Sequence, residues 1–199
     1  GLPLVTAKVA VRNSKVGEIG LSYMGGVYNK FQDDGLQLDD KRRVHVFAID
    51  FNSTIAKTKT FITAEWAWIK VNVPSTFTQQ YGNKQQGGFL DIVQPVLKKK
   101  MLGWQNATLN IACRMEYVDW NKGVFTSTGG NISEHLWSIM PAVSLRPTSQ
   151  TVFRFNYRHQ RLHVVAIGSH QNGVGGLIGL NIGLPARTAF TRFSASLAL

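Results

Sequence analysis

The chain has a single cysteine, Cys113, and no long apolar run. One thiol excludes an internal disulfide and a zinc site built on several thiolates. A helix that crosses a membrane needs roughly 18 or more consecutive apolar residues. The apolar segment at residues 164–167 is interrupted within a few positions, so the sequence excludes a helical membrane protein.

Acidic residues are scarce. Eleven Asp and Glu stand against 22 Lys and Arg, which gives a formal net charge of +11. Such an excess attracts nucleic acid, acidic lipid headgroups or anionic solutes. A length of 199 residues at 44% hydrophobic content suits a soluble domain as well as a membrane barrel. The arrangement of the residues must therefore distinguish these classes.

Motifs for catalysis or cofactor binding are also missing. His159, His163 and His170 have no HExxH spacing, and residues 173–179 contain neither Gly-Lys-Ser/Thr nor GxGxxG. No grouping of serine, histidine and an acid stands out. We expect no enzyme activity, no cofactor and no metal site, and we predict that the three histidines lie in a loop.

What the sequence does contain is alternation of apolar and polar residues with period two. In residues 151–160, Phe153 and Phe155 fall on one side of an extended strand, while Arg154 and Arg158 fall on the other. One side suits lipid and the other water, so we predict an antiparallel transmembrane β-barrel in an outer membrane. Nine strands are predicted, at residues 4–12, 17–28, 43–52, 60–73, 87–97, 108–120, 135–145, 151–160 and 188–199.

The joints between these strands are alternately short and long, with long joints at residues 29–42, 74–84 and 121–133. Outer-membrane barrels have short turns on the periplasmic side and long loops outside. The first predicted strand then starts at the outer face, and nine is an odd number. We therefore expect residues 1–199 to form a single β-barrel region that lacks at least one upstream strand, the C-terminal part of a larger barrel.

Two features interrupt the strand pattern. Residues 161–187 are rich in glycine, and we predict a long loop there, with an extra hairpin as the alternative. Pro95 and Pro141 fall inside predicted strands, where each removes a backbone donor. We expect a β-bulge at each proline.

The water-facing side of the strands carries charges of both signs. Under the alternation rule, the predicted pore-lining residues are Lys8, Arg12, Glu18, Asp50, Glu65, Asp91, Arg114, Glu116, Arg146, Arg154, Arg158 and Arg192. Seven are basic and five acidic, a net of about +2 under the same rule. Cross-strand pairing would satisfy most of them. We interpret Arg114 and Glu116 as structural rather than selective, and a mild anion preference remains possible.

Aromatic residues recur near the outward ends of the strands, where a girdle at the membrane interface would lie. The predicted girdle consists of Tyr28, Trp68, Tyr117, Trp120 and Tyr157. In a soluble sandwich the same residues would be core or edge aromatics.

Four segments, at residues 64–67, 86–89, 114–119 and 146–157, resemble the phosphate-selective porin family and the related putative porins of Bacteroidetes-type outer membranes. The resemblance covers roughly residues 17–158 and reappears in the last predicted strand. It implies a barrel of the sixteen-strand class, usually a homotrimer, in the bacterial outer membrane. Such a barrel passes small hydrophilic solutes, often anions.

The first functional hypothesis is therefore a porin-like channel for passive diffusion of small polar or anionic solutes, with outer-membrane lipid around it. The alternative is a soluble all-β binding module for polyanionic ligands. We expect no nucleic-acid partner, because the basic and aromatic residues oppose each other across the strands instead of sharing a face.

Overall fold

The computed structural model describes residues 2–72, 83–101, 103–123, 130–132, 134–148, 150–166, 169–183 and 193–198, with side chains described up to residue 163. The regular elements in these ranges are all β-strands, so the predicted all-β fold is confirmed. They are β1 (Val5–Asn13), β2 (Gly17–Val27), β3 (Gln32–Asp33), β4 (Leu36–Gln37), β5 (Arg43–Thr54), β6 (Phe61–Val71), β7 (Lys84–Met101), β8 (Trp104–Asn121), β9 (Glu134–Arg146), β10 (Val152–Ala166), β11 (Ser169–Gly183) and β12 (Phe193–Ala198).

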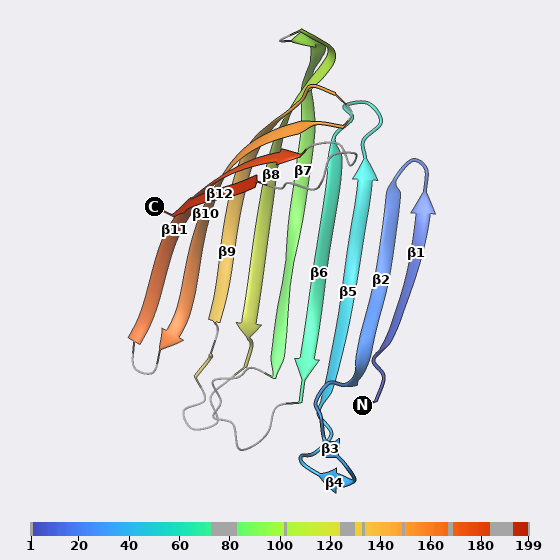
Figure 1. The fold of residues 1–199 in the computed structure, drawn as a ribbon, viewed down its shortest axis with the longest axis vertical. Helices are drawn as coiled ribbons and strands as arrows, with labels where there is room; N and C mark the ends of the chain where they lie inside the picture. Colours follow the sequence, from blue (N-terminus) through green and yellow to red (C-terminus); the bar gives the residue numbers. More distant parts are fainter. Residues whose placement is uncertain are drawn as a thin grey trace.

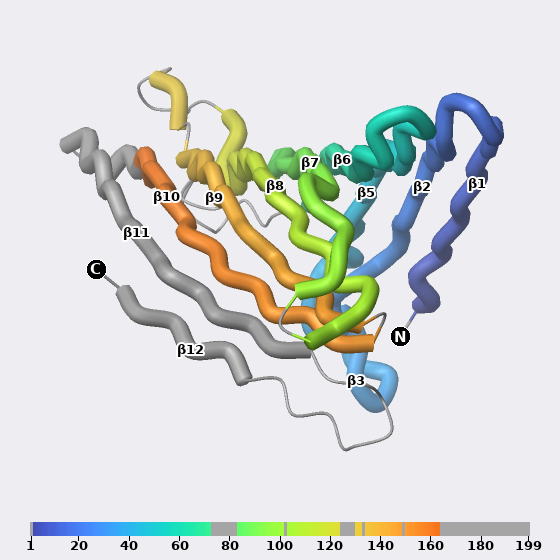
Figure 2. Tube along the Cα trace, turned by 90° about the horizontal axis from the view of Figure 1, so that it is seen from above, coloured from blue at the N-terminus to red at the C-terminus, as the bar shows by residue number. Residues whose placement is uncertain are grey.

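Ten of these strands form one antiparallel sheet in the order β1-β2-β5-β6-β7-β8-β9-β10-β11-β12, while β3 and β4 pair in the loop after β2. Each strand of the large sheet thus lies beside its neighbours in the chain (Figure 1). The strands β1 and β10 lean in opposite directions in Figure 2, which is the accumulated twist of a many-stranded sheet. Because β1 and β12 each have one neighbour, the described residues form an open sheet rather than a closed barrel.

The prediction of a loop at residues 161–187 is wrong for residues 161–166 and 169–183, where the alternative, a hairpin, is closer to what the structure contains. β10 continues to Ala166, and β11 pairs with it along its whole length, from Ser169 opposite Ala166 to Gly183 opposite Val152. The glycine-rich segment forms a strand because a sheet ladder uses only backbone groups, which glycine supplies like any other residue. Among the described residues the large sheet therefore has ten strands, not nine, so the odd strand count from which an upstream strand was expected is wrong.

The two prolines behave differently. The register between β7 and β8 shifts between Pro95 and Leu97, which confirms the expected bulge. No shift occurs at Pro141, which pairs with Cys113 of β8 in an unbroken register, so the bulge predicted there is wrong. The pairing of β9 with β10 is interrupted at Met140 and Pro141 and resumes in the same register. The missing proline N–H therefore leaves a gap in one ladder without displacing the strand.

The register gives the sheet two chemically different faces. Gly20, Asp50, Glu65, Phe89 and Glu116 lie directly opposite one another on successive strands, so they share the face that we call the charged face. The residues that alternate with them form the apolar face. Large side chains on the apolar face stay exposed, among them Val9 (69%), Leu21 (60%), Phe47 (55%) and Phe155 (55%).

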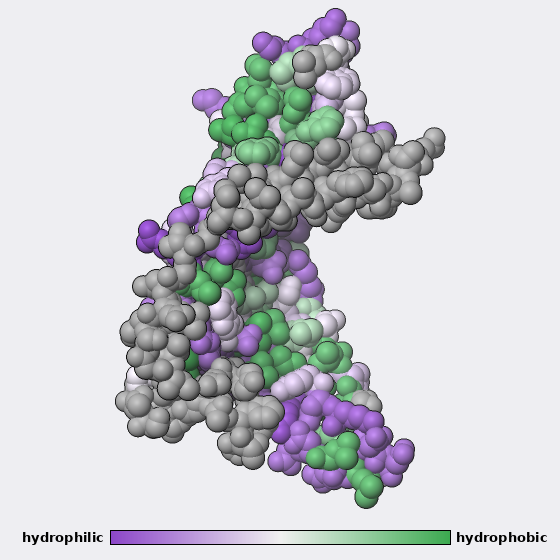
Figure 3. Space-filling view, turned by 60° about the vertical axis from the view of Figure 1, so that its left-hand side comes forward, coloured by the Kyte–Doolittle hydropathy of each residue, from purple (hydrophilic) through white to green (hydrophobic). Residues whose placement is uncertain are grey.

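Hydrophilic side chains gather at the two ends of the molecule. In Figure 3 they cover the tip of the β7–β8 hairpin at the top and much of the β3–β4 region at the bottom, with hydrophobic and hydrophilic patches interspersed between. The short turns after β1, β5 and β7 lie at the first of these ends (Figure 1). We call it the short-turn end and the opposite one the long-loop end.

The turn between β1 and β2 depends on Gly17. Its φ is +124°, and a Cβ there would lie 2.2 Å from the carbonyl oxygen of Asn52. We expect Gly17→Ala to lower the free energy of unfolding by about 1–3 kcal/mol, measured by urea unfolding in detergent micelles. Gly35→Ala is the control, because Gly35 has φ +85° with nothing within 4 Å of a Cβ. Equal losses at both positions would contradict the steric explanation.

Candidate functional site

The centre of the charged face holds four charged side chains from β7, β8 and β10. Arg114 Nε donates to Asp91 Oδ1 at 2.8 Å, and Arg114 Nη1 lies 3.6 Å from Glu116 Oε1. Arg158 Nη2 donates to Glu116 Oε2, which also accepts a 2.9 Å hydrogen bond from the Ser138 hydroxyl. Two acids and two bases make this charged cluster neutral.

Small side chains make room for the charged cluster. Arg158 of β10 reaches Glu116 of β8 across β9, where Ser138 stands in the row and is 2% exposed. On the other side, the guanidinium carbon of Arg114 lies 4.3 Å from the centre of the Phe89 ring. The four charged side chains are 19–36% exposed. They are partly removed from water, where paired charges are stabilising and unpaired ones are costly.

A second ion pair crosses β2 in the same way. Lys8 of β1 bonds Asp50 of β5 at 2.8 Å, over the position of Gly20 in β2. A Cβ on Gly20 would lie 2.4 Å from Asp50 Oδ2, so glycine is what lets the carboxylate lean toward β1. Glu65 lies directly opposite Asp50 on β6 and adds to the negative field at Lys8. The pair thus tethers the edge strand to the third strand of the sheet.

The remaining predicted pore-lining residues are less enclosed. Arg12 lies opposite Glu18 in the β1–β2 register, at the edge of the sheet. Arg146 and Arg154 are exposed and form no ion pair within the described part of the chain. Arg192 lies outside the described residues. Apart from Glu18, which follows the β1–β2 turn, the acids of the charged face lie near its centre, and Arg146 and Arg154 lie toward the short-turn end without ion pairs.

A hollow opens at that end of the charged face. Lys98, Thr108 and Arg146 lie in one row across β7, β8 and β9. With Trp104 they line a hollow of about 630 Å³. Two cations, a hydroxyl and an indole thus line the same space. This combination suits the binding of an anion.

The apolar face carries a chain of ring contacts. Trp66 of β6 and Tyr117 of β8 stack at 5.9 Å with their planes 7° apart, on either side of Gly88 in β7. A Cβ on Gly88 would come within 2.7 Å of Trp66 Cε3. Two aromatic rings covering a strand glycine in this way support the sheet where the glycine itself packs nothing.

Histidines extend this chain of rings toward β10, and a separate tyrosine–histidine pair lies on the same face nearer the other edge. Tyr117 lies 5.7 Å from His135, and His135 stacks on His163 at 5.1 Å between ring centres. Toward the other edge, the Tyr23 hydroxyl and His45 Nδ1 are hydrogen bonded at 2.9 Å. We call the set Tyr23, His45, Trp66, Trp68, Tyr117, His135 and His163 the aromatic row.

The histidine prediction is wrong where the structure can test it. His159 and His163 lie in β10, not in a loop, and His159 packs against Trp137 with ring centres 6.1 Å apart. His170 lies in β11. The missed signal is the spacing of His159, Arg161 and His163, which continues the alternation beyond residue 160 with ring and cationic side chains in place of aliphatic ones.

The predicted girdle residues take several positions. Trp68, Tyr117 and Tyr157 lie on the apolar face, and Trp68 contacts Trp66 with ring centres 6.4 Å apart. Trp120 sits at the β8–β9 register shift between Asp119 and Asn121. Tyr28 follows β2 and donates to the Asn72 carbonyl at 3.2 Å. The girdle stays a prediction, and the structure adds Trp66 and the histidines beside it.

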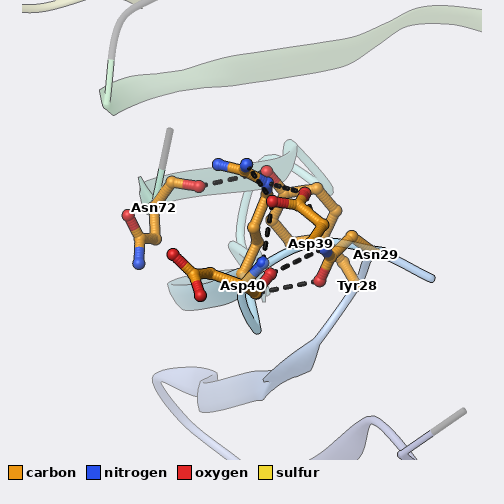
Figure 4. Close-up of polar contacts among 6 residues, drawn as sticks. Tyr28, Asn29, Asp39, Asp40 and Asn72 are labelled. Carbon is orange, nitrogen blue, oxygen red and sulfur yellow. Dashed lines mark hydrogen bonds and ion pairs between the residues drawn. The ribbon is translucent and has the colours of Figure 1, made fainter. Parts of the chain in front are cut away.

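The long loop after β2 is closed by a polar cluster, the loop clamp (Figure 4). Arg42 donates two hydrogen bonds of 2.6 Å to the Asp39 carboxylate. The Asn29 amide donates to Asp39 Oδ2 and to the Asp40 carbonyl, and its oxygen accepts from the Arg42 backbone N–H at 2.8 Å. The Arg42 guanidinium lowers the pKa of Asp39 below its usual value. The clamp therefore joins both ends of the loop.

Two further features were looked for in the residues that the structure describes, a membrane-spanning helix and a metal site. No helix there is long and apolar enough to cross a membrane. No three His, Cys, Asp or Glu side chains within the same ranges are placed to hold a metal ion.

The charged cluster predicts that two carboxylates on the same face differ in how much they contribute to the free energy of unfolding. We expect Glu116→Gln to lower the free energy of unfolding by about 2 kcal/mol, because Arg158 loses its charged acceptor. Glu18→Gln, on the same face but outside the ion pairs described above, should cost far less. Unfolding in urea followed by tryptophan fluorescence measures both, and equal effects would count against a bracing role for the cluster.

The loop clamp predicts a pH response. Because the folded pKa of Asp39 is lowered, its stabilising contribution is complete above the ordinary value of 3.8 and is lost as the pH falls through the folded value. Hydrogen exchange of the Arg42 amide should accelerate in that acid range beyond the intrinsic pH trend. Asp39→Asn removes the titrating group and should abolish this step. A step that survives in the variant would exclude Asp39 as its source.

Comparison with known proteins gives no assignment. No family model matches the chain, and no curated protein or solved structure matches it either.

Proposed function

We propose that the chain forms the wall of a bacterial outer-membrane porin, a channel without enzymatic activity. In this proposal the apolar face contacts lipid, and the charged face lines a water-filled path for small hydrophilic solutes. The observation that carries it is the exposed apolar face. Val9, Leu21, Phe47 and Phe155 are all more than half exposed, and soluble monomers rarely leave such side chains uncovered over a continuous surface.

A soluble binding module accounts for this face less well. In a β-sandwich a second sheet covers the apolar side of the first. Within the described residues the second sheet is β3–β4, with two residues in each strand. It lies beyond the long-loop end of the large sheet and does not stack on either of its faces (Figure 1). Lipid is therefore the better cover for this surface.

The two faces also divide the charges as a pore requires. The charged cluster and the Lys8–Asp50 pair lie on one side of the sheet, while Trp66, Trp68 and Tyr117 lie on the other, toward the long-loop end. Tyrosine and tryptophan favour the membrane interface because one part of the ring system is apolar and one part is polar.

A closed barrel needs partners for the free edges of β1 and β12, since lipid cannot satisfy free backbone groups. The proposal therefore includes closure of the sheet into a barrel of the sixteen-strand class and assembly of three copies into a homotrimer.

Membrane insertion and pore formation test the proposal directly. The protein refolded in detergent should migrate faster on a gel before heating than after, and it should give conductance steps in planar bilayers. A monodisperse protein in detergent-free buffer, without conductance, would overturn the proposal in favour of the soluble module.

Solute preference should depend on the arginines without ion pairs. We expect Arg146→Glu combined with Arg154→Glu to shift the permeability ratio toward cations by about twofold or more, measured as the reversal potential in a salt gradient. The control reverses Lys41 and Lys84, which lie at the long-loop end. Equal shifts in both variants would indicate a general charge effect instead of one at the pore lining.

A further inference from the structure

The hollow at the short-turn end of the charged face lies where the β7–β8 hairpin extends past the end of β9 (Figure 1). The β8–β9 ladder reaches as far as the row of Thr108 and Arg146. Pro147 follows, and it has no backbone N–H with which to continue the ladder. The start of β8, residues 104–107, therefore lies beyond this last row and forms an overhang beside the end of β9.

A β-bulge shapes the overhang. The register between β7 and β8 shifts between Lys99 and Met101, and a bulge of this kind bends a strand and redirects its side chains. Trp104, Gln105 and Asn106 are consecutive, yet all line the hollow. A regular strand would send the middle one to the opposite face. The bulge is therefore what gathers an indole and two amide side chains around one space.

The hollow is positively charged without compensation. Lys98 and Arg146 flank Thr108 in one row, and both are exposed. Neither forms an ion pair within the described part of the chain. Residues 92–115 and 135–199 contain no aspartate or glutamate. The charge of these two cations is thus available to a ligand.

The wall of the hollow formed by the turn after β9 is held in place. The Thr148 hydroxyl, which lines the hollow, accepts hydrogen bonds from the backbone N–H groups of Gln150 and Thr151 at 3.3 and 3.2 Å. A side chain that fixes its own turn in this way is already ordered before a ligand arrives. Binding then costs less conformational entropy than it would in a loose loop.

The size and the lining of the hollow indicate which anion fits. Its volume of about 630 Å³ lies in the range of sites that hold small organic molecules, roughly 300–1,000 Å³. The Trp104 side chain is 37% exposed in it and offers a flat apolar surface on which a ring can stack. The Arg146 guanidinium matches the two oxygens of a carboxylate. A small inorganic anion would use the cations and leave the indole facing water.

We propose that the hollow binds aromatic carboxylates, with Arg146 and Lys98 contacting the carboxylate and Trp104 stacking on the ring. This inference rests on the proposed function, because a solute reaches the hollow along the charged face of the water-filled path. It names the class of solute that the path retains at its positive end.

Binding of small probes tests the proposal. The protein refolded in detergent micelles is titrated in a calorimeter with phenylbutyrate, butyrate, phenylbutanol or inorganic phosphate, with micelles alone as the blank. We expect phenylbutyrate to bind about tenfold more tightly than each of the others, because it alone carries both a ring and a carboxylate. Equal binding of butyrate or phosphate would exclude the ring contact, and equal binding of phenylbutanol would exclude the ionic one. Either result would overturn the proposal.

Substitutions locate the two contacts. Arg146→Gln should weaken phenylbutyrate binding about tenfold, because charge-assisted hydrogen bonds are lost, and Lys98→Gln should weaken it several-fold. Lys99→Gln is the matched control, since it removes the same charge from the next residue, which does not line the hollow. Trp104→Leu should weaken phenylbutyrate several-fold and leave butyrate unchanged. Equal losses in Lys98→Gln and Lys99→Gln would indicate a general charge effect and overturn the proposal.

Conductance separates this inference from the porin proposal. Conductance steps in planar bilayers from a protein that does not bind phenylbutyrate would overturn the inference while the porin proposal stands. Binding that depends on Arg146 and Trp104, without conductance steps, would support the site and overturn the porin proposal.

Discussion

The pleat of the strands governs this structure, because it sends successive side chains to opposite sides of a single sheet. Leu21, Phe47 and Trp66 go to one side, and Asp50, Glu65 and Glu116 go to the other. Because the strands are hydrogen bonded in sequence order, most of the large apolar side chains up to residue 163 fall on one side and the paired acids fall on the other. A one-residue slip of β5, β6 or β8 would place a carboxylate among the aromatic rings, so the two surfaces hold the registers of these strands in place.

The charged side imposes a second requirement, since carboxylates and guanidinium groups near a wall of low dielectric must be paired. The chain meets this requirement with small residues in the intervening strands as well as with the charged residues themselves. Gly20 lets Asp50 reach Lys8, and Ser138 lets Arg158 reach Glu116, so each ion pair spans an intervening strand. Such pairs connect strands that share no backbone hydrogen bonds. Each of them must therefore break when either of the two backbone ladders between its strands separates.

Much of this could be predicted from the sequence, because period-two alternation is a local signal. The strands around Val9, Leu21 and Phe155 are visible in it, and so is the face on which each side chain falls. β11 was not, because its glycines carry no side chain that could alternate. Nor could the partners of Arg158 and Lys8 be predicted, since they depend on which small residue occupies the strand between, and thus on the register of three strands at once. At Pro141 the missing donor faces β10, a direction that no sequence pattern reveals.

The separation of roles among the charges follows from the same geometry. Arg114 and Arg158 are held by Asp91 and Glu116, so their fields largely cancel within a few ångströms and add little to the potential along the face. Arg146 has no such partner and shares a hollow with Lys98. In the proposed channel, an ion moving along the charged face would therefore meet a nearly neutral centre and a positive opening. The residues that stabilise the sheet in this proposed channel therefore differ from the residues that select the solute.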